Sequence, residues 1–278
     1  MPELPEVETI RRELAPELKG RRVTVARIRR RDIVGHPTPR ALRERLKGAA
    51  FRGLGRKGKY LIARLDRGRE LVFHMRLSGH LEVVGQDERP RFERARFELD
   101  DGRALSFVEP RVLGKVYLVE AGCYPPALRG MQAMGCEPVG DGFDRAYLAD
   151  KLSGRKASVK SLLLDQRVCC GVGNIYSDEA LFRARIRPTR PAGGLSSAEV
   201  GRLARSLRSV LADGIRWCGT TLSDGRYLRP GTQSGGFQRH LKVFGRKGEK
   251  CRRRGCGGTV ERVKMGNRNS YYCPRCQR

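Results

Sequence analysis

The chain has 278 residues and a formal net charge of +28, because 58 lysines and arginines outnumber 30 aspartates and glutamates. That length is enough for two domains with separate cores and a small appendage. The excess of positive charge favours a polyanionic partner, with nucleic acid as the leading candidate, although an arginine-rich solvated surface is the alternative. No apolar stretch approaches the roughly 20 residues of a membrane span, and the N-terminus lacks a signal-peptide pattern. We therefore expect a cytoplasmic protein with reduced cysteines.

Residues 3–14 are predicted to form a helix, because prolines are tolerated in its first turn and apolar residues recur at helical spacing. Glu3 and Glu6 then share one face of that helix. From about residue 21 to 120, short alternating apolar runs separated by glycine-bearing turns predict an antiparallel sandwich or barrel. The 3.6-residue period returns later, where Ser196 and Glu199 form a capping box before a long amphipathic helix.

The pattern predicts an α+β fold in three parts. The first is an N-terminal helix with a β-sandwich at 1–130, followed by a glycine- and proline-rich linker at 131–143. A helical domain is expected at 144–238, including a long loop at 219–238, and a small basic module at 239–278.

The last module contains four cysteines with the spacing C-x4-C-x16-C-x2-C, namely Cys251, Cys256, Cys273 and Cys276. Two such pairs around a β-hairpin can close a tetrahedral zinc site, which supplies folding energy that so small a module lacks. Two disulfides are the alternative, and a reducing compartment disfavours them. The hairpin tip carries Arg268, which suits insertion into a DNA groove.

The N-terminus presents a second candidate site. Removal of Met1 would give Pro2 a free secondary amine, and a neutral amine can attack a sugar C1′ and form an iminium. An α-amino group has a reference pKa of roughly 8, so much of it is uncharged near neutral pH. Glu3 can transfer protons as the sugar ring opens, and Glu6 can hold the amine or order a water. The alternative to a catalytic site is an ordinary helix N-terminus, where proline is common and acidic side chains interact favourably with the helix dipole.

Four segments resemble bacterial formamidopyrimidine-DNA glycosylases, in the family's order. Residues 1–9 (MPELPEVET) resemble the family's N-terminus, and residues 56–61 (RKGKYL) resemble the hairpin with its essential lysine. Residues 162–182 resemble its helix–two-turns–helix element, and residues 236–277 resemble its zinc finger. The resemblance covers essentially the whole chain. It implies a two-domain fold with DNA in the cleft between the domains and one structural Zn²⁺.

The resemblance implies a bifunctional glycosylase and lyase of base excision repair, which flips 8-oxoguanine or a formamidopyrimidine out of the stack and removes it. By position, Pro2 resembles the Schiff-base nucleophile, Glu3 the proton donor and Glu6 the supporting carboxylate. Lys59 matches the lysine at the lesion phosphate, and Arg268 the arginine that assists the final elimination. Further DNA contacts are expected at His74, Leu77, Arg111, Leu113, Arg155, Lys156 and Asn174.

The chain departs from the family at several positions. Leu77 and Leu113 stand where the family has methionine and phenylalanine, and Glu109 stands at an aspartate position. Leucine can still plug a base stack, but it loses aromatic stacking worth about 1–3 kcal/mol. Arg111, which reads the opposite cytosine in the family, is kept, whereas Phe92 replaces a common histidine. These departures bear on lesion preference more than on chemistry.

Two other functions fit the same sequence. One is this fold with a preference for oxidised pyrimidines, as in the related endonuclease VIII enzymes, but the start at residues 4–7 (LPEV) favours purines. The other is a non-catalytic DNA-binding protein, which would not need Pro2, Glu3 and Lys59. The expected partner is double-stranded DNA with an oxidised base or abasic site, bound by a monomer at the nucleoid. Loop 219–238 is expected to order over the flipped base.

Overall fold

The computed structural model describes every residue except Met1, Asp224 and Arg226. The expected removal of Met1, and part of the predicted loop at 219–238, therefore lie outside the described residues. Within the described part, no helix has the length and apolarity needed to cross a membrane.

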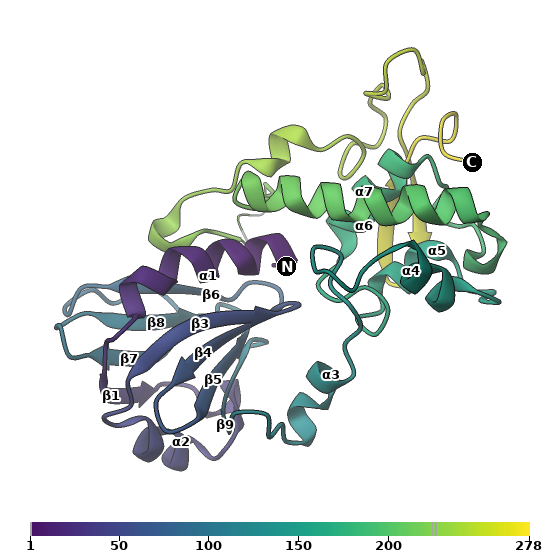
Figure 1. Cartoon of the computed structure of the whole chain (residues 1–278). Helices are drawn as coiled ribbons and strands as arrows, with labels where there is room; N and C mark the ends of the chain where they lie inside the picture. Colours follow the sequence, from purple (N-terminus) through teal and green to yellow (C-terminus); the bar gives the residue numbers. More distant parts are fainter. Residues whose placement is uncertain (1, 224, 226) are drawn as a thin grey trace. The chain divides into compact units, whose positions relative to one another are not determined.

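The chain forms two compact units (Figure 1). Unit 1 comprises Met1–Gln132 and Trp217–Gln238, and unit 2 comprises Ala133–Arg216 and Arg239–Arg278. Residues 217–238 fall within the helical domain predicted at 144–238, so the assignment of this segment differs.

Unit 1 begins with α1 (Leu4–Leu18), which starts one residue later than predicted, with Glu3 as its N-cap, and continues four residues beyond residue 14. Its apolar stripe packs into one buried core cluster together with side chains from both sheets. The strands are β1 (Val23–Ile28), β2 (Val34–His36), β3 (Phe51–Lys57), β4 (Tyr60–Leu65), β5 (Arg69–His74), β6 (His80–Val84), β7 (Glu93–Leu99), β8 (Ala104–Val108) and β9 (Lys115–Glu120). Short helices are η1 (Arg31–Ile33), α2 (Pro39–Leu46), η2 (Pro126–Leu128) and α3 (Arg129–Gln132).

These strands form two sheets, with the orders β1-β7-β8-β6 and β2-β9-β5-β4-β3. The predicted sandwich is confirmed, since alternate residues of both sheets fill a common core. One detail differs from the antiparallel prediction, because β2 pairs with β9 in parallel.

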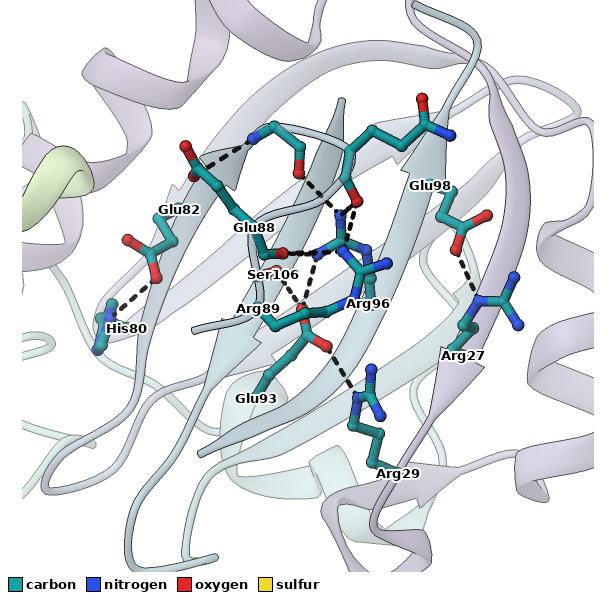
Figure 2. Close-up of polar contacts among 12 residues, drawn as sticks. Arg27, Arg29, His80, Glu82, Glu88, Arg89, Glu93, Arg96, Glu98 and Ser106 are labelled. Carbon is teal, nitrogen blue, oxygen red and sulfur yellow. Dashed lines mark hydrogen bonds and ion pairs between the residues drawn. The ribbon is translucent and has the colours of Figure 1, made fainter. Parts of the chain in front are cut away.

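A buried arginine organises the outer face of the four-stranded sheet (Figure 2). Arg96 on β7 is only 1% exposed, because the loop between β6 and β7 folds over it. Its guanidinium donates to the carbonyls of Gly85, Gln86 and Glu88 at 3.0, 2.9 and 2.9 Å, and to the Glu93 carboxylate at 3.0 Å. These bonds fix the conformation of that loop, since its carbonyls would otherwise be buried unpaired.

The segment Trp217–Gln238 joins unit 1 through contacts with α1. Tyr227 is 3% exposed within the core cluster, and its hydroxyl donates to the Cys218 carbonyl at 3.0 Å. Arg229, just before η4 (Pro230–Thr232), donates from Nε to the Glu13 carboxylate at 2.7 Å. A buried tyrosine and an ion pair to a distant helix are invisible to local sequence periodicity, which explains the different assignment.

Unit 2 contains the predicted helices and the C-terminal hairpin. Glu199 and Ser196 cap α7 reciprocally, as expected: the Ser196 N–H donates to the Glu199 carboxylate at 2.8 Å, and the Glu199 N–H to the Ser196 hydroxyl at 3.3 Å. The main elements are α4 (Arg145–Leu152), α5 (Val159–Leu164), α6 (Asn174–Ala184), η3 (Ala192–Gly194), α7 (Ser197–Arg216), β10 (Glu261–Met265) and β11 (Arg268–Tyr272). A short helix, η5 (Phe237–His240), connects the two units.

Candidate active site and DNA-contact residues

The N-terminus of α1 holds three of the predicted catalytic residues. Pro2, Glu3 and Glu6 are all buried, the two glutamates at 2% and 1% exposure. One oxygen of Glu6 accepts the Glu3 N–H at 2.8 Å, and the other accepts the Thr220 N–H at 2.7 Å. Gly219 has a φ of +78°, and a Cβ there would lie 2.9 Å from the Glu6 carboxylate. Glu6 therefore fixes both the start of α1 and the loop segment at residue 220. No sequence pattern had linked these two segments.

The predicted lysine lies in the turn between β3 and β4. Lys59 is 7% exposed and follows Gly58, whose φ of +56° closes the turn. Arg56 donates to the Gly58 carbonyl at 3.1 Å and to the Glu8 carboxylate on α1 at 3.2 Å. Burial opposes ionisation of Glu8, but hydrogen bonds from arginines such as Arg11 lower its pKa to about 2. The Arg56–Glu8 pair that ties this turn to α1 is therefore ionised across physiological pH.

His74 ends β5 and is a neutral group at physiological pH. Burial, together with the charges of Arg76 and Lys59, lowers its pKa to about 3. Its Nδ1 accepts the Arg76 N–H at 3.1 Å, and its ring packs edge-on against Tyr60 with centroids 4.5 Å apart. A DNA contact from His74 would thus be a neutral hydrogen bond, and the contact remains a prediction.

The residues predicted to fill the space left by a flipped base lie on loops with exposed side chains. Leu113 is 42% exposed, Arg111 is exposed and Leu77 is half-buried. Phe92, whose carbonyl accepts the Glu109 N–H at 3.1 Å, is 39% exposed with a φ of +66°, and the Arg91 guanidinium lies 4.6 Å from its ring centroid. Such an arginine–aromatic stack on an exposed, strained residue is a candidate DNA contact. Phe92 was singled out in the sequence by its family position, whereas its stacking with Arg91 was not predicted. The dense run of arginines in residues 89–96 was the available signal.

In unit 2, Asn174 is the first residue of α6, as predicted. Its Nδ2 donates to the Asn269 carbonyl at 3.0 Å, while its buried Oδ1 has no hydrogen-bond partner in the part of the chain that the structure describes. Arg268 is exposed at the start of β11, where it pairs with Met265 across the hairpin tip. The structure therefore places Asn174 against the hairpin that presents Arg268. Arg155 and Lys156 are exposed on the segment before α5.

A buried ion pair joins α5, α6 and the same hairpin. The Lys160 ammonium lies 2.5 Å from the Asp178 carboxylate, and the two side chains are 1% and 0% exposed. Asp178 also accepts the Ser270 hydroxyl at 2.6 Å and the Tyr271 N–H at 2.9 Å. Burial raises the pKa of Asp178, whereas Lys160 and these two donors favour its charged form. The network sets the position of β11 relative to α6.

Replacement of Lys160 by methionine is expected to reduce the free energy of unfolding by about 3–5 kcal/mol, because the buried Asp178 carboxylate loses its counter-ion. Denaturant unfolding followed by circular dichroism measures this change. Lys151→Met is the matched control, since Lys151 pairs with Asp150 at the surface and such pairs contribute about 0–1 kcal/mol. Equal losses in the two variants would contradict the assigned role of Lys160.

The four predicted zinc ligands come together at the base of the hairpin. All four Sγ atoms lie within 4.8 Å of one another, with Cys251 and Cys276 at 3.9 Å and Cys256 and Cys273 at 3.6 Å. Tetrahedral zinc with Zn–S bonds of about 2.3 Å separates its sulfurs by about 3.8 Å. The donor set therefore fits one zinc ion, and the four-residue spacing of the first pair does not disturb it.

Three family models match consecutive parts of the chain. The formamidopyrimidine-DNA glycosylase N-terminal domain matches residues 1–116, and the H2TH domain of the same glycosylases matches residues 134–225. The zinc finger found in FPG and IleRS matches residues 248–278. Together with the sulfur geometry, this match assigns one structural zinc to the four cysteines.

Curated relatives and solved structures agree with these models. A formamidopyrimidine-DNA glycosylase of Rhizorhabdus wittichii is 43% identical to this chain, and the match covers 100% of both proteins. One of Pelotomaculum thermopropionicum is 39% identical, and the match covers 100% of this chain and 99% of that protein. The crystal structure of MutM (FPG) from Thermus thermophilus superposes with a TM-score of 0.90 at 38% identity, covering 99% of this chain and 98% of that one. Lactococcus lactis Fpg bound to abasic-site DNA superposes with a TM-score of 0.91 at 29% identity, covering 99% of each chain. The chain therefore belongs to the formamidopyrimidine-DNA glycosylase family.

Proposed function

We propose that this DNA repair glycosylase excises oxidised purines from double-stranded DNA and then cleaves the strand at the abasic site, with the Pro2 amine as nucleophile. The observation that carries the proposal is the buried N-terminus of α1, where Pro2 precedes Glu3 and where Glu6 accepts the Glu3 N–H. Mere DNA binding needs no such arrangement. Related structures support the partner, since Lactococcus lactis Fpg is bound to Fapy-dG and abasic-site DNA.

The residues divide into groups that react and groups that hold them. Both oxygens of Glu6 are engaged by backbone N–H groups, so its role is to fix Glu3 and the segment at Thr220. Glu3 is then assigned to proton transfer, because it adjoins the nucleophile. Lys59 and Arg268 are assigned to phosphate contacts and to the eliminations that follow base loss. We further propose that a monomer acts at the nucleoid in the cytoplasm.

The proposed chemistry begins when the Pro2 nitrogen bonds to C1′ and the C1′–O4′ bond breaks, while Glu3 protonates O4′. The bond between C1′ and the damaged base then breaks, and the departing base takes the amine proton. An iminium between Pro2 and C1′ remains. Loss of a C2′ proton expels the 3′ phosphate, and loss of a C4′ proton expels the 5′ phosphate. Water then hydrolyses the iminium and frees Pro2 from the sugar remnant, which leaves a one-nucleotide gap.

Borohydride trapping tests this proposal. The protein is incubated with a duplex that contains 8-oxoguanine opposite cytosine, and in parallel with an abasic-site duplex. Reduction of the iminium should give a covalent protein–DNA band on both duplexes, and Pro2→Gly should lose the band while it still binds DNA.

A band on the abasic duplex alone would retain the mechanism but move the lesion preference elsewhere, with Leu77 and Leu113 as the first candidates. Absence of a band on both duplexes would exclude Schiff-base chemistry and leave a DNA-binding protein.

A further inference from the structure

Two loops of unit 1 carry the residues assigned to the space left by a flipped base. Leu77 lies in the loop between β5 and β6, and Arg111 and Leu113 lie in the loop between β8 and β9. One buried carboxylate contacts both loops. It belongs to Glu109, which is 0% exposed and directly follows β8.

Glu109 accepts three hydrogen bonds from neutral donors. Its Oε1 accepts the Ser78 hydroxyl at 2.5 Å and the Arg111 N–H at 3.1 Å, while Oε2 accepts the Gly114 N–H at 2.8 Å. Ser78 adjoins Leu77, and Arg111 and Gly114 enclose Leu113. A single side chain therefore connects the residues of both loops through three hydrogen bonds.

Two glycines make room for this carboxylate. A Cβ on Gly79 would lie 3.1 Å from Glu109 Oε2 and 2.8 Å from the Met75 carbonyl, and a Cβ on Gly114 would lie 2.7 Å from Oε2. Neither site accepts a larger residue without displacement of the carboxylate or the backbone. The absence of side chains at Gly79 and Gly114 thus leaves the space that the Glu109 side chain fills.

Each loop also contains a residue in the left-handed region of backbone space. Val112 has a φ of +57° and Arg76 a φ of +53°. That conformation is a genuine outlier for a β-branched residue such as Val112, and it persists only where neighbouring contacts enforce it. The hydrogen bonds that the Arg111 and Gly114 N–H groups donate to Glu109 lie on either side of Val112 and supply that enforcement.

The backbone of Glu109 is fixed from the opposite side by β7 and the loop before it. Its N–H donates to the Phe92 carbonyl at 3.1 Å, and its carbonyl accepts Arg94 Nε at 2.8 Å. The loop that ends at Phe92 is itself held by Arg96 (Figure 2). These hydrogen bonds therefore hold the backbone of Glu109 in place, and with it the position of the carboxylate.

On the basis of the proposed function, we propose that Glu109 is a positioning residue that couples the two loops and thereby sets how strongly Arg111 discriminates the opposite base. Glu109 itself touches neither the lesion nor the reacting atoms. It keeps the Arg111 backbone and Leu113 in one arrangement, and Ser78 transmits that arrangement to Leu77.

The test is equilibrium binding to duplexes that carry a stable abasic-site analogue opposite cytosine or adenine, which requires no catalysis. Wild type is compared with Glu109→Gln, which keeps the shape but replaces one acceptor oxygen by an NH₂ group. Ser78→Ala removes the bond to the Leu77 loop alone. Glu82→Gln is the matched control, since Glu82 is a buried glutamate on β6 that pairs with His80 (Figure 2).

Wild type is expected to prefer cytosine by about tenfold or more, the scale of one specific base contact. Glu109→Gln should reduce that ratio to within about threefold, Ser78→Ala should reduce it partly, and Glu82→Gln should leave it unchanged. A purely structural loss of stability would weaken binding to both duplexes and preserve the ratio. Circular dichroism at the assay temperature verifies that each variant is folded.

An unchanged ratio in folded Glu109→Gln, or a wild-type ratio near one, would overturn the proposal. An unchanged ratio in Ser78→Ala would overturn the coupling between the loops. Cytosine-selective binding by a wild-type protein that gives no borohydride adduct would instead refute the proposed chemistry and leave the role of Glu109 intact. The two failures are therefore distinguishable.

Discussion

Glu3→Gln is expected to slow single-turnover excision of 8-oxoguanine by about 10²–10⁴-fold, the usual contribution of a positioned general acid. Glu3 directly follows Pro2 at the buried start of α1, and its backbone N–H donates to the Glu6 carboxylate at 2.8 Å. Glutamine preserves the size of the side chain and the fold of the helix start but cannot donate a proton to the opening sugar. The measurement is the rate of base release from a duplex with excess enzyme.

The same variant should act much better on a duplex that already contains an abasic site, because the sugar there already opens to an aldehyde and the protonation of O4′ by Glu3 is not required. Glu17→Gln is the matched control, as Glu17 lies on the same helix with 45% of its side chain exposed. Equal loss of activity on both substrates would show that Glu3 acts after base removal or only supports folding. An unaffected rate on 8-oxoguanine would remove Glu3 from the mechanism.

The parts of the fold that the sequence predicted depend on short-range chemistry. The start of α1 follows from proline in its first turn, and the start of α7 follows from the Ser196–Glu199 box. The zinc cluster follows from the spacing of four cysteines, because a metal needs its donors close together. Strand positions followed from alternation, although the parallel pairing of the short β2 with β9 had no local signal.

The arrangement of the candidate site depends on contacts between distant residues. Glu6 and Thr220 are 214 positions apart, and Asp178 and Ser270 are 92 apart. Such contacts cannot be predicted from sequence periodicity, since each residue fits the pattern of its own segment and carries no sign of its distant partner. The role of Glu109 was equally hidden, because a glutamate next to a proline at residue 110 suggests an exposed turn, whereas the folded chain buries it.

Removal of zinc is expected to unfold the C-terminal hairpin of unit 2. Structural zinc contributes about 10–16 kcal/mol to the folding of finger peptides, which is comparable with the whole stability of an ordinary domain. Without the metal, the hairpin of β10 and β11 depends on a small apolar cluster around Val243 and Val260 and on the polar contacts of β11 with Asp178 and Asn174. Hydrogen exchange read by mass spectrometry should therefore accelerate across residues 261–272, while the strands of unit 1 keep their protection.

Loss of the hairpin should also weaken DNA binding, because Arg268 would no longer be held beside Asn174 and because Asp178 would lose the Ser270 and Tyr271 donors. Zinc release is measured with a colorimetric chelator, and Cys273→Ser should reproduce the exchange pattern of the chelated protein. Cys123→Ser is the control, since that exposed cysteine is not part of the cluster. A chelated protein that releases one zinc per chain yet keeps residues 261–272 protected would show that Lys160–Asp178 and its partners hold the hairpin without the metal. Absence of released zinc would show instead that the four thiols, although correctly spaced, do not bind it.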